Sequence, residues 1–242
     1  MNKTALSVTS ERRGFALRNP ALANIYQEWY QLQRRYLSPI EGQTLELGSG
    51  AGFIKRVIPS AITSDVVACE GIDLCLDALE IGSRYSSQLA NVLMVNVFHH
   101  IFDSARFLRQ ASSSLLPGGR LVMIEPWVNI WSSLCYRLVG HEPLNTKQEG
   151  WTFPSQNPLF DSNQAQAWIV FERDRDRFFL DFPEFRILKL ECIMPVAYLL
   201  TGGHSKPTGL PPACLAICRS LEKGWLDRHY GLFALIVIEK LR

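Results

Sequence analysis

The chain has 242 residues, of which 47% are hydrophobic and 20% are charged, and its formal net charge is +2. This composition is typical of a globular protein with a sizeable core and excludes intrinsic disorder of the whole chain. The small net charge gives no reason to expect a nucleic-acid partner, because proteins that neutralise many phosphates carry a much larger basic excess.

The cysteine pattern and the apolar runs also exclude several classes of protein. The six cysteines form neither a CxxC pair nor a cluster with zinc-ligand spacing, so we expect no metal site. The N-terminal segment lacks the apolar stretch of a signal peptide, and the longest apolar run, 232–238, has the length of a buried strand. We therefore expect a soluble, cytoplasmic protein without a transmembrane segment.

The first third of the chain predicts a helix, a strand and a glycine-rich turn. Apolar residues between 19 and 37 recur at helical spacing, and Pro20 suits a first helical turn. Residues 43–47 predict a short strand that runs into the glycines of 48–52. A short helix over 53–58 is expected to follow the turn.

The middle and the end of the chain predict an α/β fold. The segments 61–65, 72–77, 89–98 and 120–125 predict strands, and 102–116 predicts a helix that the turn 117–119 closes. The apolar runs are continuous rather than alternating, which is typical of parallel strands covered on both faces. Residues 185–200 and 232–241 predict a final strand pair, antiparallel and separated by a helix around 213–226.

We found no internal repeat or low-complexity linker, so a single domain is expected over 1–242. Within it, 1–40 is the N-terminal helical segment, 41–126 the cofactor-binding half, 127–185 an aromatic cap and 186–242 the C-terminal strand pair. The cap is expected to begin with a helix that carries Trp127, Trp131, Leu134 and Leu138 on one side. It could pack on the sheet, form an apolar acceptor pocket or rest on a membrane surface. The charged run 172–177 predicts a solvated helix face with i,i+3 pairs.

The stretch from Glu46 to Phe53, ELGSGAGF, is the motif that carries chemistry. Glycines at 48, 50 and 52 allow a tight turn and a close approach to a ligand, and the following helix N-terminus can attract an anionic group. A P-loop would need a Gly-Lys-Ser/Thr ending, whereas Ile54 precedes Lys55 here. The dinucleotide pattern GxGxxG would need a glycine where Phe53 stands.

What remains is an acidic residue two places before GxGxG, and this resembles the first motif of the class I methyltransferases that use S-adenosylmethionine. Further motifs follow in that family's order. Asp65 resembles the acid that holds the ribose hydroxyls, and Asp77 with Ala78 resembles the adenine-binding position, unless a shifted register gives that role to Asp73. Residues 96–101, NVFHHI, resemble the fourth-strand motif, and 116–120, LPGGR, the turn before strand five.

This resemblance is strong over about 41–126 and implies a Rossmann-like, mostly parallel seven-stranded sheet with helices on both faces and an antiparallel C-terminal strand pair. It implies S-adenosylmethionine as cofactor. The expected cofactor-binding residues are Glu46, Gly48, Ser49, Gly50, Gly52, Asp65, Asp77, Ala78 and Asn96. The chain departs from the family before strand four. Family members usually have Leu-Pro-Phe and then a Phe-Asp pair there, whereas this chain has Ile-Gly-Ser at 81–83 and Leu-Ala-Asn at 89–91.

Histidines supply the candidate catalytic groups. His99 and His100 follow the fourth strand, and His141 with Glu142 lies in the cap as a candidate acid/base pair. Methyl transfer from a sulfonium needs a base only when the acceptor must lose a proton. We therefore expect methyl transfer to a small, fairly apolar acceptor such as a lipid-linked molecule. The alternatives are a non-catalytic binding protein of this family and a nicotinamide-dependent oxidoreductase.

Overall fold

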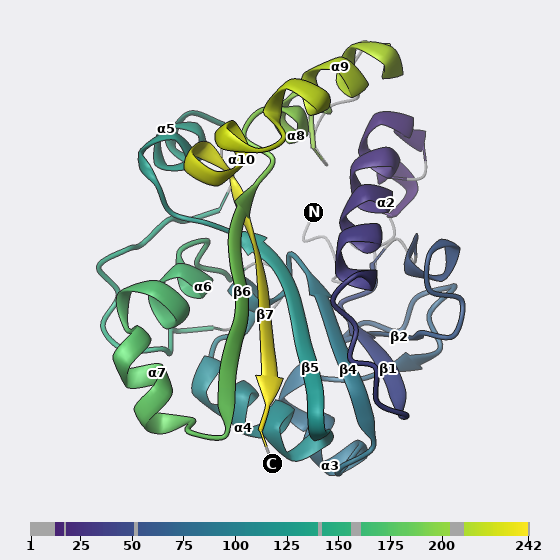
Figure 1. The fold of residues 1–242 in the computed structure, drawn as a ribbon, viewed down its shortest axis with the longest axis vertical. Coiled ribbons are helices and arrows are strands. Elements are labelled where there is room, and N and C mark those ends of the chain that lie inside the picture. The colour runs from purple at the N-terminus through teal and green to yellow at the C-terminus, as the bar shows by residue number, and fades with distance from the viewer. Residues whose placement is uncertain are drawn as a thin grey trace, which may run out of the picture.

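The structure is a computed structural model that describes residues 13–16, 18–50, 53–139, 142–155, 161–203 and 211–241. Its centre is a seven-stranded sheet in the order β3-β2-β1-β4-β5-β7-β6 (Figure 1). The strands are β1 (Gln43–Leu47), β2 (Ile62–Asp65), β3 (Leu74–Cys75), β4 (Leu89–Val95), β5 (Leu115–Pro126), β6 (Phe185–Ile193) and β7 (Phe233–Lys240).

The strand directions confirm the predicted topology. β1, β2, β3, β4 and β5 are mutually parallel, whereas β7 is antiparallel to both of its neighbours, β5 and β6. Because the parallel strands all end at one edge of the sheet, the residues that follow β1, β2 and β4 lie at that edge together. This is the edge at which α/β proteins bind ligands.

Both faces of the sheet are covered, as the continuous apolar runs predicted. All seven residues of β4 are buried. Along β1, Leu45 and Leu47 point into one core, together with residues of α4 (Ser104–Ser114) and α7 (Arg175–Asp181). The other core lies between the opposite face and α2 (Pro20–Arg34), which contributes Trp29 and Tyr30 among others. Glu46 stands between the two leucines on the strand, so its side chain points to the α2 side.

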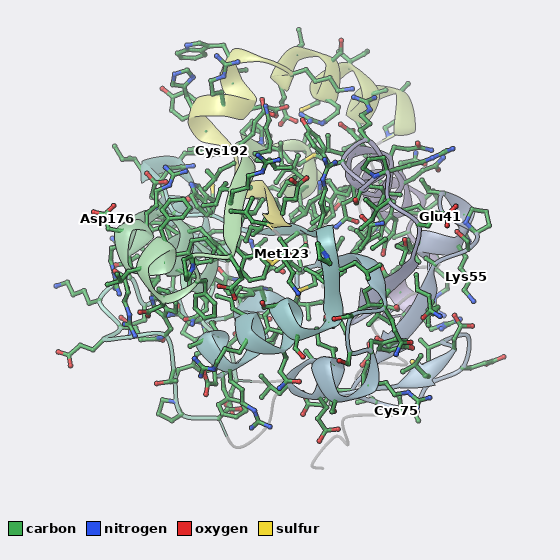
Figure 2. The ribbon with its side chains drawn as sticks, turned by 60° about the horizontal axis from the view of Figure 1, so that its bottom comes forward. Glu41, Lys55, Cys75, Met123, Asp176 and Cys192 are labelled. Atoms are coloured by element: carbon green, nitrogen blue, oxygen red, sulfur yellow. The ribbon has the colours of Figure 1, made fainter. Side chains whose placement is uncertain are left out.

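The remaining helices are short. They are the 3-10 turns η1 (Phe53–Arg56), η2 (Ala78–Glu80) and η3 (Phe98–His100), the π-helical turn η4 (Ile169–Arg173), and the α-helices α3 (Ile81–Arg84), α5 (Ile130–Val139), α6 (Gln166–Trp168), α8 (Ala197–Leu200), α9 (Pro212–Glu222) and α10 (Trp225–Tyr230). Lys55 of η1 and Asp176 of α7 mark opposite sides of the molecule in Figure 2. No helix in the described part of the chain is long and apolar enough to cross a bilayer.

Several predicted elements are shorter than expected. The helix over 53–58 is only the 3-10 turn η1, and the strand over 72–77 shrinks to the two residues of β3. The strand over 185–200 ends at Ile193, because Met194 has a positive φ of 61° and Pro195 follows; α8 takes the remainder. The helix around 213–226 is interrupted at Gly224, whose φ is 97°. The turn 117–119 lies inside β5 rather than before it.

The aromatic cap packs on the sheet. Trp127 and Trp151 are buried in the same core as Leu45 and Leu47. The predicted one-sided helix stripe is wrong, however: Trp127 precedes α5 and is buried, whereas Leu134 and Leu138 of α5 are exposed.

The charged run 172–177 forms the i,i+3 pair Glu172–Arg175 at 3.9 Å, as predicted, but it is more than a solvated face. Arg173 donates to the carbonyl oxygens of Thr146 and Gln148, and it also pairs with Asp174. These bonds hold the cap loop against η4.

Candidate functional site

The glycine turn after β1 is tight on one side and open on the other. Gly48 has a φ of 65°, and a Cβ placed on it would lie 2.4 Å from Cγ2 of Val97, which follows β4. Gly50 has a φ of 47°, and the nearest atom to a Cβ placed on it is the carbonyl oxygen of Gly48 at 3.8 Å. The turn therefore needs glycine at 48 for its contact with Val97, and among the described residues it leaves space beside Gly50. Gly52, also predicted in this turn, lies outside the described residues.

Glu46 precedes this turn as a buried carboxyl group with a spare oxygen. Burial raises its pKa to about 7, although hydrogen bonds from Ser49 and Tyr30 lower it. Its Oε2 is buried and has no hydrogen-bond partner among the described residues. An unpaired buried polar atom is costly, and its presence beside an open turn is typical of a site that a ligand completes.

Asp65, at the end of β2, holds the turn from the neighbouring strand. Its Oδ2 accepts a hydrogen bond from the backbone N–H of Gly50 at 3.1 Å, and its Oδ1 accepts one from Val67 at 3.1 Å. Ser49 joins the same strand, because its hydroxyl accepts from the N–H of Ser64 at 3.0 Å. Burial raises the pKa of Asp65. The carboxylate, which also accepts from the backbone of Val66, keeps lone-pair capacity for a ligand, since each oxygen can accept two bonds.

Asp77 lies two residues beyond β3, so it does not end the strand as predicted. Its Oδ1 accepts from the N–H of Leu79 at 2.8 Å, so it caps the turn that begins at Ala78. The alternative residue, Asp73, is occupied elsewhere: it accepts from the N–H and hydroxyl of Thr63 at 2.8 and 2.9 Å and pairs with Lys55 at 2.6 Å. The hydrogen bond from Lys55 holds the pKa of Asp73 well below its usual range.

Asn96, immediately after β4, has a strained backbone and a second spare oxygen. Its φ is 56°, and its Oδ1 is buried without a partner in the described part of the chain. Strained residues of this kind cluster at ligand sites. β1 and β4 are adjacent strands, so Glu46 and Asn96 place two buried oxygens that have no partner among the described residues at neighbouring strand ends.

His99 and Glu125 form a buried pair beside the turn. Glu125 lies near the end of β5 and accepts from the backbone N–H groups of Val97 and Phe98 at 2.7 and 2.8 Å. The Nδ1 of His99 contacts Oε2 of Glu125 at 2.7 Å. Because Val97 also packs against Gly48, this pair adjoins the glycine turn.

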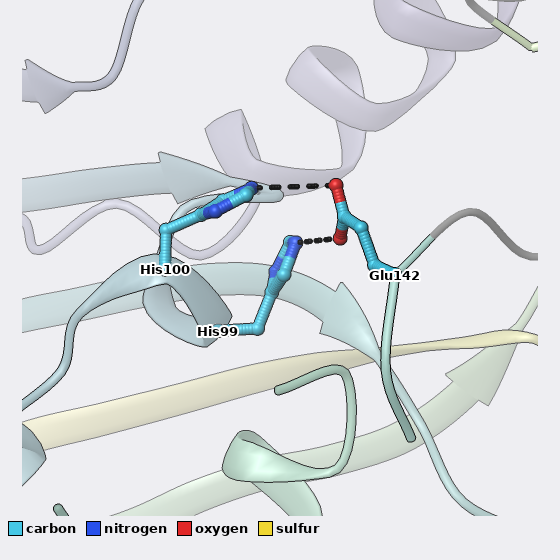
Figure 3. A group of neighbouring side chains, drawn as sticks. All are labelled: His99, His100 and Glu142. Carbon is cyan, nitrogen blue, oxygen red and sulfur yellow. Dashed lines mark ion pairs between the residues drawn. The ribbon is translucent and has the colours of Figure 1, made fainter. Parts of the chain in front are cut away.

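Glu142 brings the cap into contact with both histidines (Figure 3). Its Oε2 lies 3.2 Å from Nε2 of His99, and its Oε1 lies 3.7 Å from Nε2 of His100. Burial alone would lower the pKa of His99, but the two carboxylates, Glu125 first, raise it to about 9. His99 is therefore an imidazolium at neutral pH with both ring nitrogens engaged.

His100 is the more accessible histidine. Its side chain is 18% exposed, compared with 4% for His99, and its Nδ1 lies 3.4 Å from the carbonyl oxygen of Asp161. His141, the third predicted catalytic histidine, lies outside the described residues. The structure thus joins three of the four predicted acid/base groups, His99, His100 and Glu142.

These three groups also form a donor set that could hold a metal ion. One ligand atom from each lies within 4.8 Å of the others. Two imidazoles and a carboxylate would suit a divalent transition metal. A protonated His99 between Glu125 and Glu142 has both of its ring nitrogens paired without an ion, and the expectation of no metal stays a prediction.

Sequence reasoning missed Glu125. The signal was present, because Glu125 is an acidic residue near the end of a strand, after the apolar run 121–124, and Glu46 and Asp65 also lie near strand ends. A carboxylate there lies at the ligand-binding edge of a parallel sheet.

Comparison with known proteins shows relatives of the fold but not of the sequence. No family model matches the chain, and no curated protein matches it. A S-adenosylmethionine-dependent methyltransferase from Archaeoglobus fulgidus superposes with a TM-score of 0.56 at 14% identity, covering 90% of this chain and 94% of that one. The YcgJ protein from Bacillus subtilis superposes with a TM-score of 0.50 at 11% identity, covering 89% and 99%.

Proposed function

We propose that this chain, whose fold is that of the class I S-adenosylmethionine-dependent methyltransferases, transfers a methyl group from S-adenosylmethionine to a small, fairly apolar acceptor. One observation carries the proposal. Glu46 and Asn96 leave two buried oxygens unpaired within the described chain, at neighbouring strand ends beside a glycine turn that is open at Gly50. A ligand with hydrogen-bond donors would complete both.

The residues present fit this cofactor. The carboxylate of Glu46 suits its ammonium group, and an opposite charge nearby would favour the ionised carboxylate. The spare lone pairs of Asp65 suit ribose hydroxyls. Asp77 and Ala78 lie at the next strand end toward the sheet edge, where the adenine is expected. The turn of Gly48, Ser49 and Gly50, with Gly52, would let the backbone approach the ligand closely.

The protein's share of the chemistry is positioning. When bound, the cofactor supplies a methyl group on a positively charged sulfur, which is already activated toward direct displacement. The chain has to hold the acceptor atom in line with that methyl group and exclude water. We expect the cap, whose Trp127 and Trp151 are buried in the core on one face of the sheet, to help exclude water from the site.

An acceptor that loses a proton would need a base, and we assign that role to His100. His99 is held as an imidazolium by Glu125 and Glu142, so its ring has no free lone pair. His100 Nε2 stands 3.7 Å from Glu142, which would stabilise the imidazolium that forms when the proton arrives. His99 and Glu125 then position Glu142 and, through it, His100. His141 remains a candidate of the same kind.

The experiment is methyl transfer from cofactor labelled in its methyl group to the small molecules of a cell extract. We expect label to enter the organic-soluble fraction, and we expect Asp65→Ala to abolish it. Asp73→Ala is the matched control, because Asp73 is an acid of the same region that bonds to Thr63 and Lys55 instead.

The two alternatives give different results. A non-catalytic relative would bind the cofactor but transfer no label to the organic-soluble or the aqueous fraction of the extract. A nicotinamide-dependent oxidoreductase would instead change the absorbance of reduced nicotinamide in the same extract. Either outcome would refute methyl transfer.

A further inference from the structure

The polarity of α9 and α10 is inverted. Three of their ionisable side chains, Arg219, Glu222 and Asp227, are buried, with 8%, 3% and 8% exposure. The guanidinium of Arg219 donates to both carboxylate oxygens of Asp227, at 2.7 and 2.9 Å. A helix on a protein surface normally turns its charged residues to water and its apolar residues inward.

This inversion is fixed by hydrogen bonds to the backbone. Glu222 accepts from the N–H groups of Val196 and Ala197 at 2.6 and 2.7 Å. Asp227 accepts from the N–H of Met194 at 2.9 Å. The charged groups therefore anchor the two helices to the end of β6, and the helices cannot rotate without breaking these bonds.

The outward faces carry large apolar side chains instead. Ile217 and Leu221 of α9 are four residues apart and are 63% and 73% exposed, and Trp225, the first residue of α10 after the break at Gly224, is 62% exposed. Such a stripe, which leaves several large side chains in water, marks an interaction surface rather than scattered exposure.

α5 adds a second apolar stripe beside the first. Ile130, Leu134 and Leu138 are 92%, 50% and 74% exposed, again at intervals of four residues. Asn129, just before α5, donates to the carbonyl oxygen of Gly231, just after α10, at 2.7 Å. The three helices lie together at the upper end of the molecule in Figure 1.

This end is also the ligand-binding edge of the sheet. The last residue of β5, Pro126, and the last of β6, Ile193, both pair with Phe233, the first residue of β7. The described helices between β6 and β7, which include α9 and α10, therefore lie at the end of the sheet where β5 stops. An apolar ligand held at this surface would be near the strand ends described above.

The exposed charges on these helices have one sign. α5, α9 and α10 contain two acidic residues, Glu222 and Asp227, and both are buried. Among the described residues, the exposed charged side chains of these three helices and of the turn between α9 and α10 are Arg137, Lys223 and Arg228; Lys223 also lies 3.8 Å from Glu28 of α2. Apolar residues with cations around them match an anionic lipid surface, in which apolar side chains enter the acyl boundary and Lys and Arg meet the headgroups.

We propose that Ile130, Leu134, Leu138, Ile217, Leu221 and Trp225 form a docking surface that binds the interface of an anionic phospholipid bilayer. The charge pattern favours this occupant over a second copy of the chain, because two such surfaces would bring cations of the same sign together. The proposal does not depend on the methyltransferase activity.

The test is co-sedimentation of the full chain with vesicles of phosphatidylcholine, with or without phosphatidylglycerol. We expect binding to the anionic vesicles, and a loss of about fivefold for each charge removed in Lys223→Gln and Arg228→Gln. The double variant Leu221→Ser/Trp225→Ser is expected to bind at least about tenfold less. Leu180→Ser is the matched control. Leu180 is 80% exposed on α7, which leads into the first residue of β6 at the end of the sheet opposite to the docking surface.

Circular dichroism of each variant shows whether it is folded, and all five substituted positions are exposed, so folding should be retained. Equal binding by wild type and the double variant would overturn the proposal, as would absence of binding to anionic vesicles. A wild-type dimer that the double variant converts to a monomer, with no vesicle binding, would assign the surface to self-association instead.

Discussion

The Glu46→Gln substitution is expected to stabilise the ligand-free protein and to weaken cofactor binding at the same time. Burial raises the pKa of Glu46 from 4.5 to about 7, so the folded state retains a proton that the unfolded chain releases. Wild-type stability should therefore fall as pH rises from 4.5 through 7, and the loss is complete above that range. At about 1.4 kcal/mol for each pKa unit, the ionised carboxylate costs about 3 kcal/mol.

Glutamine carries no charge, so it avoids this cost while its oxygen can still accept from Ser49 and Tyr30. We expect the variant to exceed the wild type in free energy of unfolding by about 3 kcal/mol above pH 7 and to equal it below pH 4.5. Urea denaturation across this pH range measures the difference. Cofactor affinity should fall roughly tenfold to a hundredfold, since a hydrogen bond to a charged group contributes about 1.5–3 kcal/mol. A difference in stability that does not change with pH would refute the reasoning.

Three further predictions follow from the same site. Gly50→Ala should cost only about 1–2 kcal/mol of backbone strain yet block the cofactor, whereas Gly48→Ala should cost about 2–5 kcal/mol because it also clashes with Val97. Thermal unfolding with and without cofactor distinguishes a loss of stability from a loss of cofactor binding in the two variants. Normal cofactor binding by Gly50→Ala would contradict the account. The ion pairs of His99 should contribute about 3 kcal/mol to the free energy of unfolding below pH 6.5, and this contribution should be lost as pH rises through 9. The difference in free energy of unfolding between the wild type and His99→Gln should therefore shrink over that range. A constant difference would argue against an imidazolium. A chelator should leave methyl transfer unchanged; loss of activity restored by zinc would make the His99–Glu142 cluster a metal site.

The edge of the sheet that carries the candidate site could be predicted from sequence, because its features are local. A glycine-rich turn directly after a strand, and a carboxylate at the end of the next, are visible without tertiary contacts. Parallel strands then bring those ends together. The same logic, applied to β5, would have found Glu125.

Contacts between distant segments could not be predicted in this way. Nothing local to Glu142 indicates that it reaches His99 and His100, since this depends on how the cap folds over the sheet. The apolar periodicity of α9 is a similar case. Periodicity shows that one face is apolar, but the buried network of Arg219, Glu222 and Asp227 decides that this face points outward.

Calorimetric titration of the folded protein with S-adenosylmethionine and S-adenosylhomocysteine tests the central claim most directly. We predict saturable binding of both ligands by the wild type, its loss in Asp65→Ala and its retention in Asp73→Ala. No binding of either ligand by folded wild-type protein, or unchanged binding by Asp65→Ala, would contradict the assignment of the glycine turn and its neighbouring strand ends as a cofactor site.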